Sequence, residues 1–217
     1  GAAGPLGGDD LRLDVEVGPG AQLSVRSVAA SIALPGPGGA ASRMHVRATV
    51  AAGAVLHWQP EPLIAAAGCN HDVFTEVLVA AGGAVAWRDD VVCGRHAEPP
   101  GDVRINTVIE YAGRALHRHE LHLGPGAPGW AGAAVLGGAR ALGTVVIINP
   151  DWVDGGPPPA WVPAADAAVM PLTGPAVLAT AVAPDSRAVA AALDPLSAPP
   201  TRVDHEVSGV GSPVLRH

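Results

Sequence analysis

Lysine is absent from the 217 residues, so all 13 basic residues are arginine, against 20 acidic residues and a formal charge of −7. Without lysine the chain cannot form the GxxxxGK[ST] loop that holds phosphate in many NTPases. The arginines form no basic run, and we do not expect an acidic chain of this kind to bind nucleic acid or an anionic membrane surface. The composition therefore argues against these function classes.

Cysteine and long apolar runs are also scarce. The two cysteines, Cys69 and Cys93, form no CxxC pair, which predicts free thiols in a reducing, cytoplasmic compartment. No uninterrupted apolar run reaches the roughly 18 residues of a membrane-spanning helix, and the first residues do not resemble a signal peptide. Hydrophobic residues still make up 48% of the chain, which is enough for a packed core. We expect a single cytoplasmic domain over residues 1–217.

Strict alternation of apolar and polar residues predicts β-strands. Leu11, Leu13, Val15 and Val17 alternate with polar residues, and after a Gly-Pro-Gly turn the alternation resumes over 22–25, which predicts a hairpin. Further strands are expected at 44–50, 55–58, 73–79, 85–92, 103–109, 115–123 and 144–148. The pattern indicates an all-β meander up to about residue 150.

A short glycine motif recurs where one strand ends and the next begins. It starts at Gly20, Gly53, Gly83 and Gly113, at intervals of about 30 residues. A period of this size is typical of strand pairs stacked as in a solenoid. The alternative is that hairpins in an alanine-rich chain often contain Gly-Ala turns.

The last third of the chain has a different composition. Residues 151–175 are rich in Pro, Gly and Ala and predict a long surface loop. Asp185-Ser186 provides helix-capping chemistry before an alanine-rich stretch, so a short helix is expected over 187–193, ended by Asp194-Pro195. Residues 196–217 are expected to form a flexible tail.

The densest cluster of reactive side chains lies in one predicted strand. There His117 and His119 face one side, while Glu120 and His122 face the other. Two imidazoles one residue apart can share a metal, as in the HxH motif of cupin barrels, although a permanent site needs three or four convergent ligands. A cupin-type β-barrel metalloenzyme built on these two histidines is therefore one hypothesis. No GxSxG or HExxH motif is present.

Three other groups of residues have two interpretations each. Cys69 and Cys93, with nearby histidines, could bind structural zinc or be ordinary loop residues. Asp89 and Asp90 are adjacent in a predicted strand, so one carboxylate points into the protein unless the strand lies at a sheet edge. Asp9 follows two glycines, where an aspartate commonly caps its own turn.

Taken in order along the chain, a set of short motifs resembles the urease accessory protein UreD (UreH) family. The similarity extends from about residue 4 to 195, and the first strands of the family are missing upstream. Tyr-Arg and Gly-Glu of the family are replaced here by Leu34-Pro35 and Gly101-Asp102. The matching motifs are Gly7-Gly8-Asp9 with Leu11, Gly20-Ala21, the strand at 27–32, the run from His57 to Ile64, Asp89 ahead of Gly94-Arg95, and Gly143-Thr144.

The resemblance implies a non-enzymatic function with no catalytic residue. UreD-like proteins join the urease apoprotein to a UreF-like protein and a UreG-like GTPase, and the complex inserts nickel into the urease active site. The implied fold is a β-helix-like stack of sheets with one or two short helices. No cofactor is expected to be permanently bound; nickel is in transit. The residues implied in the nickel path are Asp9, Asp89 and, on the strand where the family places another polar residue, His119.

Overall fold

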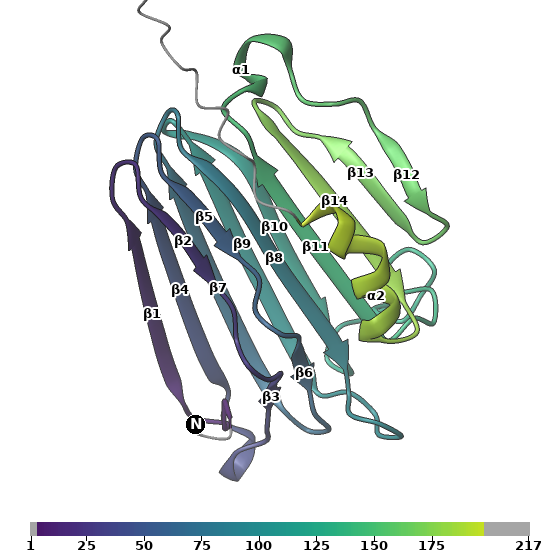
Figure 1. Cartoon of the computed structure of the whole chain (residues 1–217). Coiled ribbons are helices and arrows are strands. Elements are labelled where there is room, and N and C mark those ends of the chain that lie inside the picture. The colour runs from purple at the N-terminus through teal and green to yellow at the C-terminus, as the bar shows by residue number, and fades with distance from the viewer. Residues whose placement is uncertain (1–3, 198–217) are drawn as a thin grey trace, which may run out of the picture.

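The computed structural model of the chain describes residues 4–197 and arranges them as two β-sheets packed face to face (Figure 1). Sheet 1 has five strands, in the order β1 (Asp10–Val17), β4 (Ser42–Val50), β7 (Asn70–Val79), β9 (Asp102–Tyr111) and β10 (Arg114–Leu123). Sheet 2 has nine strands. Its main order is β12 (Trp161–Ala164), β13 (Ala167–Pro171), β14 (Ala176–Ala183), β11 (Ala141–Ile148), β8 (Ala84–Cys93), β5 (Val55–Trp58) and β2 (Gln22–Val25), and β3 (Ser31–Ala33) pairs with β6 (Leu63–Ala65) beside β8.

The first half of the chain winds between the two sheets as a β-solenoid. Strands β1, β4 and β7 pair in parallel in sheet 1, and β2, β5 and β8 pair in parallel in sheet 2. The chain passes from one sheet to the other at Gly20, Gly53 and Gly82, which have φ of 71°, 68° and 79°, a region that favours glycine. The first three members of the repeat are therefore structural, with Gly82 in place of Gly83. The fourth, Gly113, lies instead in the turn between the antiparallel strands β9 and β10 of sheet 1.

The predicted hairpin of residues 11–17 and 22–25 is wrong, because β1 and β2 lie in different sheets and each pairs in parallel with a strand of the next coil. The predicted meander up to about residue 150 is also wrong, because the strands up to β9 pair in parallel with the strand of the next coil. Within residues 4–150, β9 and β10 are the one pair of consecutive strands that is antiparallel. The strands β8, β11, β14 and β13 also pair antiparallel, but β8 and β11 are separated in the chain by β9 and β10 of sheet 1. Alternation defines which side chains face the core, but it does not define the partner strand.

The predicted surface loop at 151–175 is also wrong. It contains a one-turn helix, α1 (Trp152–Gly155), and the strands β12 and β13, which extend sheet 2 at its edge. The edge strand β12 tolerates Pro163, since a missing backbone N–H costs no ladder bond on the open side, and Pro171 is the last residue of β13. The predicted tail, residues 196–217, lies almost wholly outside the described residues.

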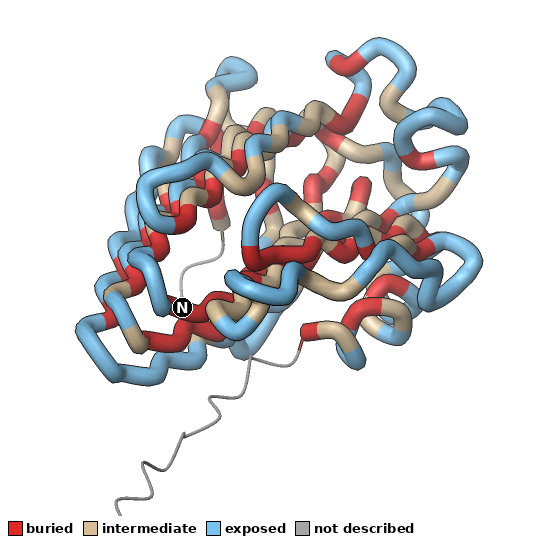
Figure 2. Tube along the Cα trace, turned by 90° about the horizontal axis from the view of Figure 1, so that it is seen from above, coloured by how far each residue is buried: buried red, intermediate tan, exposed pale blue. Residues whose placement is uncertain are grey.

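The predicted helix is confirmed as α2 (Ser186–Leu193). The Asp185 carboxylate caps it by accepting the Ala188 N–H at 2.9 Å. The helix covers the outer face of sheet 2, where Val189 and Leu193 pack on β11 and β14 (Figure 1). The other buried apolar residues lie mainly between the two sheets, whereas the turns at the sheet ends are mostly exposed (Figure 2). All-β stacking with short helices is thus confirmed.

Gly143 allows α2 to approach the sheet. A Cβ atom there would lie 2.5 Å from Val189 Cγ1 and 2.8 Å from Leu193 Cδ1 and would also collide with the Asp90 carboxylate. We expect Gly143→Ala to lower the free energy of unfolding by about 1–3 kcal/mol, the usual cost of overpacking. Urea denaturation would measure it. Gly18→Ala is the matched control, because a Cβ at Gly18 meets nothing within 4 Å; equal effects would contradict the prediction.

Candidate functional site

A band of polar side chains crosses the space between the two sheets. On sheet 1, Thr75, Thr107 and His119 lie in register on the neighbouring strands β7, β9 and β10. On sheet 2, Asp89 of β8 lies in register with Thr144 of β11. We call this set, with His117, the polar lane. Its members occupy inward positions of the strands, where alternation would otherwise place apolar residues.

The polar lane separates two apolar clusters. Along β8 the inward residues are Val85 and Trp87 in the first cluster, then Asp89, then Val91 in the second. Strand β9 repeats this order, because Thr107 lies between Ile109 of the first cluster and Ile105, which packs on the second. Polar groups at such positions cost free energy unless they are hydrogen-bonded. A row of them in register on adjacent strands therefore points to function.

Two tryptophans hold Asp89. The indole N–H of Trp87 donates to Asp89 Oδ2 at 2.7 Å, and that of Trp58 donates to Oδ1 at 3.4 Å. The two indoles are stacked, with ring centroids 4.5 Å apart and an interplanar angle of 4°. On the neighbouring strand β11, the Thr144 hydroxyl donates to the Asp89 backbone carbonyl at 3.4 Å.

Burial shifts the protonation of the polar lane. It raises the pKa of Asp89 to about 6, against the two indole hydrogen bonds, which lower it; the neighbouring Asp90 also raises it. Burial lowers the pKa of His117 and of His119, and for His117 the facing His119 lowers it further. At neutral pH the lane therefore holds one carboxylate and two uncharged imidazoles.

Asp89 lies between two cavities. The larger, of about 280 Å³, extends from Gly4 and Pro5 past Met44 and Trp58 to Asp89. The smaller, of about 20 Å³, is lined by Asp89 together with Thr107, His117, His119 and Thr144. A volume of this size holds about one water molecule. Trp87, Asp89 and Ile105 line both cavities, so Asp89 stands where they adjoin.

Comparison with known proteins identifies the family. The profile of the family described as UreD urease accessory protein matches residues 1–208. The chain belongs to the UreD family. Among curated relatives, the urease accessory protein UreD of Frankia alni is 44% identical over 202 residues, which cover 86% of this chain and 67% of the relative. UreD of Streptomyces coelicolor is 45% identical over 193 residues, covering 88% and 76%, and UreD 3 of Streptomyces griseus is 45% identical with coverage of 88% and 75%.

The fold of this UreD-family chain brings two of the three predicted site residues together. Asp89 and His119 come from different sheets and line the same small cavity. Asp9 lies elsewhere, in the turn before β1, where its Oδ2 accepts the Leu6 N–H at 2.9 Å, the contact of a turn cap. Gly4 lines the larger cavity, but Asp9 is not among the residues that line either cavity.

The interpretation of Asp89-Asp90 as an edge-strand pair is wrong, because β8 lies inside sheet 2, between β11 and the strands β5 and β6. The two carboxylates point to opposite faces. Asp89 enters the polar lane, whereas Asp90 pairs with the buried Arg88 on the outer face. Arg88 also pairs with Asp194, just after α2. Asp90 is therefore part of the packing of α2 and not of the lane.

The cysteine and cupin hypotheses find no support in the UreD-family chain. Cys69 and Cys93 are free, and burial raises the pKa of each to about 11, which disfavours the thiolate that binds zinc. Within residues 4–197, no group of three or more His, Cys, Asp or Glu side chains is arranged to hold a metal ion. The two sheets are open at their edges and form no cupin-like barrel. In the same described range, no helix is long and apolar enough to cross a membrane.

Sequence reasoning gave no site role to the two tryptophans or to the two lane threonines, Thr75 and Thr107. Trp58 entered only as part of the His57–Ile64 run of the family resemblance. A tryptophan at an inward strand position is expected in the core, so Trp87 carried no distinct signal. The threonines could have been found. Each breaks an inward-facing series of Val or Ile, and they lie opposite each other once β7 and β9 are paired.

Proposed function

We propose that this UreD-family chain is a scaffold and nickel conduit in urease maturation. It joins the urease apoprotein to a UreF-like protein and a UreG-like GTPase in the cytoplasm, and it passes nickel through the polar lane without holding it permanently. The observation that carries the conduit is the row of polar groups that links two cavities between the sheets. Membership of the UreD family supports the role in urease maturation.

The chemistry of the polar lane suits an ion in transit. Moving a dication from water into a protein interior is costly, and a carboxylate offsets part of that cost. Asp89 supplies one negative charge, and the uncharged His117 and His119 keep lone pairs that nickel accepts. Because these groups do not form a complete ligand set, each of them binds the ion weakly and releases it.

The small cavity is the narrowest part of the proposed path. Its volume of about 20 Å³ has no room for a hydrated nickel ion. An ion that passes must exchange water for the oxygens of Asp89, Thr107 and Thr144 and for the imidazole nitrogens. This step makes Asp89 the residue whose removal has the largest effect on passage.

Replacing Asp89 with asparagine tests the conduit. We expect Asp89→Asn to leave the complex with urease and the UreF-like protein intact and to slow nickel loading by about tenfold or more, because the charge that offsets desolvation is lost. Nickel content of urease would be measured by mass spectrometry during reconstitution with the GTPase.

Asp14→Asn is the matched control, since Asp14 lies exposed on sheet 1 and pairs with Arg12. Wild-type loading by the Asp89→Asn complex would refute the conduit, and loss of the complex would assign Asp89 a structural role. Asp9→Asn distinguishes the two interpretations of Asp9 in the same assay: slower loading indicates the path, and reduced folding alone indicates the turn.

A further inference from the structure

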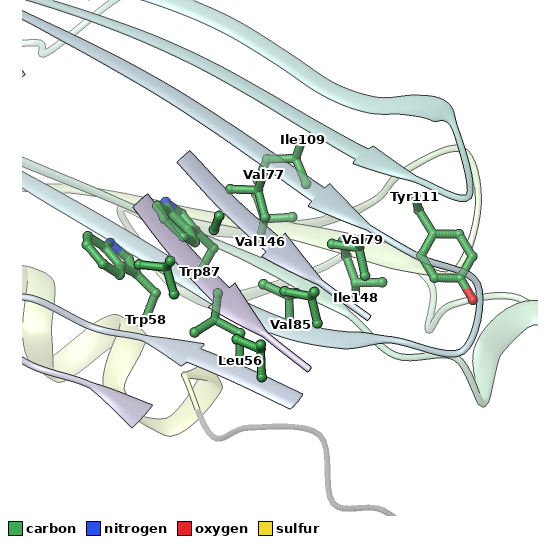
Figure 3. Close-up of a cluster of buried hydrophobic side chains, with 14 of the residues drawn as sticks. Leu56, Trp58, Val77, Val79, Val85, Trp87, Ile109, Tyr111, Val146 and Ile148 are labelled. Atoms are coloured by element: carbon green, nitrogen blue, oxygen red, sulfur yellow. The ribbon is translucent and has the colours of Figure 1, made fainter. Parts of the chain in front are cut away.

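The two indoles beside Asp89 come from adjacent coils of the solenoid. Trp58 ends β5 and is paired in register with Trp87 of β8, so the two rings stack across the parallel strands at one end of the apolar cluster (Figure 3). Trp58 is 6% exposed and Trp87 2%. A buried indole N–H needs an acceptor, and both find it on the same carboxylate, two residues beyond Trp87.

The two hydrogen bonds satisfy the indole N–H groups and also fix the Asp89 carboxylate. Each oxygen of Asp89 receives one N–H, so the carboxylate is held at both oxygens and has one orientation. An ionised carboxylate has about four lone-pair sites, and about half of them remain free for the polar lane. The ring stack fixes the donors in turn, because neither indole can rotate without leaving the other.

We propose that Trp58 and Trp87 are positioning residues for Asp89: their N–H groups hold its carboxylate aimed between the two cavities and leave it only partly available to a cation. The inference rests on the proposed nickel conduit and adds to it the reason why Asp89 binds the ion only weakly. A carboxylate whose lone pairs are partly occupied offers a passing dication few oxygens, and a fixed carboxylate needs no rearrangement at each passage.

The other titratable groups that line the two cavities lie in different positions. Glu61, His71 and Asp90 line the larger cavity, and His117 and His119 line the smaller. His71 Nδ1 lies 2.8 Å from the Ser42 hydroxyl and Asp90 is paired with Arg88. The hydrogen bonds to the Asp89 carboxylate within residues 4–197 come from the two indoles, so their removal is a specific perturbation of Asp89.

A double-mutant cycle on nickel loading tests the proposal. Trp87→Phe keeps an aromatic ring in the stack and removes the N–H. We expect it to slow loading by up to about tenfold, the effect of one hydrogen bond of ordinary net strength, and Trp58→Phe to have a smaller effect because its bond is longer. The double variant Trp87→Phe/Asp89→Asn should load no more slowly than Asp89→Asn alone. Trp152→Phe, in α1, is the control.

A spectroscopic measurement on the full chain without nickel accompanies the cycle. The resonance Raman band that reports indole N–H hydrogen bonding should shift toward weaker bonding in Asp89→Asn and stay unchanged in Asp14→Asn. This measurement does not depend on the folding of a tryptophan variant. An unchanged band in Asp89→Asn would overturn the proposal.

The outcomes separate the two proposals. If Asp89→Asn slows loading but Trp87→Phe does not, or if the two effects multiply in the double variant, the tryptophans do not act through Asp89 and the positioning role is refuted while the conduit stands. If Asp89→Asn loads at the wild-type rate, the conduit fails, and the positioning role in nickel passage fails with it. A slow Trp87→Phe variant with no further loss in the double variant supports both.

Discussion

Replacing Arg88 with methionine is expected to lower the free energy of unfolding by about 3–5 kcal/mol, the range for breaking a buried ion pair on one side. Arg88 is 3% exposed, and its guanidinium donates to both oxygens of Asp90, from Nε at 3.1 Å and from Nη2 at 2.8 Å. Asp90 has a side chain only 6% exposed, so without Arg88 its charge stays buried and unpaired. The second partner, Asp194, lies at the end of α2 and is 61% exposed, so water solvates it after the substitution.

Urea denaturation followed by circular dichroism would measure the loss. Arg12→Met is the matched control, because the Arg12–Asp14 pair lies on the exposed face of sheet 1 and such pairs contribute about 0–1 kcal/mol. The double variant Arg88→Met/Asp90→Leu should recover part of the stability, since it removes the stranded charge together with its partner. An Arg88→Met chain as stable as the Arg12→Met control would contradict the prediction.

The strands that the local pattern predicts all lie in strands of the structure, including 55–58 and 144–148, where apolar and polar residues do not strictly alternate. Leu11 to Val17 and the stretches at 103–109 and 115–123 are strands because a half-buried sheet needs one apolar face. The pairing could not be predicted in the same way. Residues 11–17 and 22–25 both turn their apolar side toward the space between the sheets, a property that a hairpin and a solenoid coil share. The glycine repeat contained the missing information, because a constant period requires equivalent strands to stack.

For the candidate site too, alternation gives the face of a strand but not what lies opposite that face. Alternation places His117 and His119 on one face of a strand, and the structure turns that face toward Asp89. Nothing local to Asp89 indicates that face, because the histidines are about 30 residues later in the chain and in the other sheet. Asp89 was found through the family resemblance. Trp87, which holds it, was not, since a buried tryptophan has the same appearance in a sequence whether or not its N–H serves a site.

Besides His117 and His119 of the polar lane, whose pKa burial also lowers, acidification is expected to destabilise the chain through two buried histidines, His57 and His71. Burial is the largest cause of the lowered pKa of both, and for His57 the nearby Arg26 lowers it further. The Nε2 atom of His57 is buried without a hydrogen-bond partner among the described residues. The unfolded chain therefore binds more protons than the folded chain once the pH falls below about 6.5, the ordinary pKa of histidine, and stability falls with pH in that window.

Each histidine contributes up to about 1.4 kcal/mol of lost stability per pH unit below that value, until it titrates in the folded chain. Protonation of Asp89 changes the stability in the opposite direction. Its folded pKa of about 6 lies above the ordinary value of about 3.9, so its protonation stabilises the folded chain below pH 6 and partly offsets the loss. Unfolding free energies from urea curves between about pH 5.5 and 7.5 would show this loss setting in below about pH 6.5. His71→Gln should flatten this slope, because glutamine takes up no proton. His45→Gln, on the exposed face of sheet 1, should leave it unchanged; a slope that both variants leave unchanged would show that the buried His71 does not control acid stability.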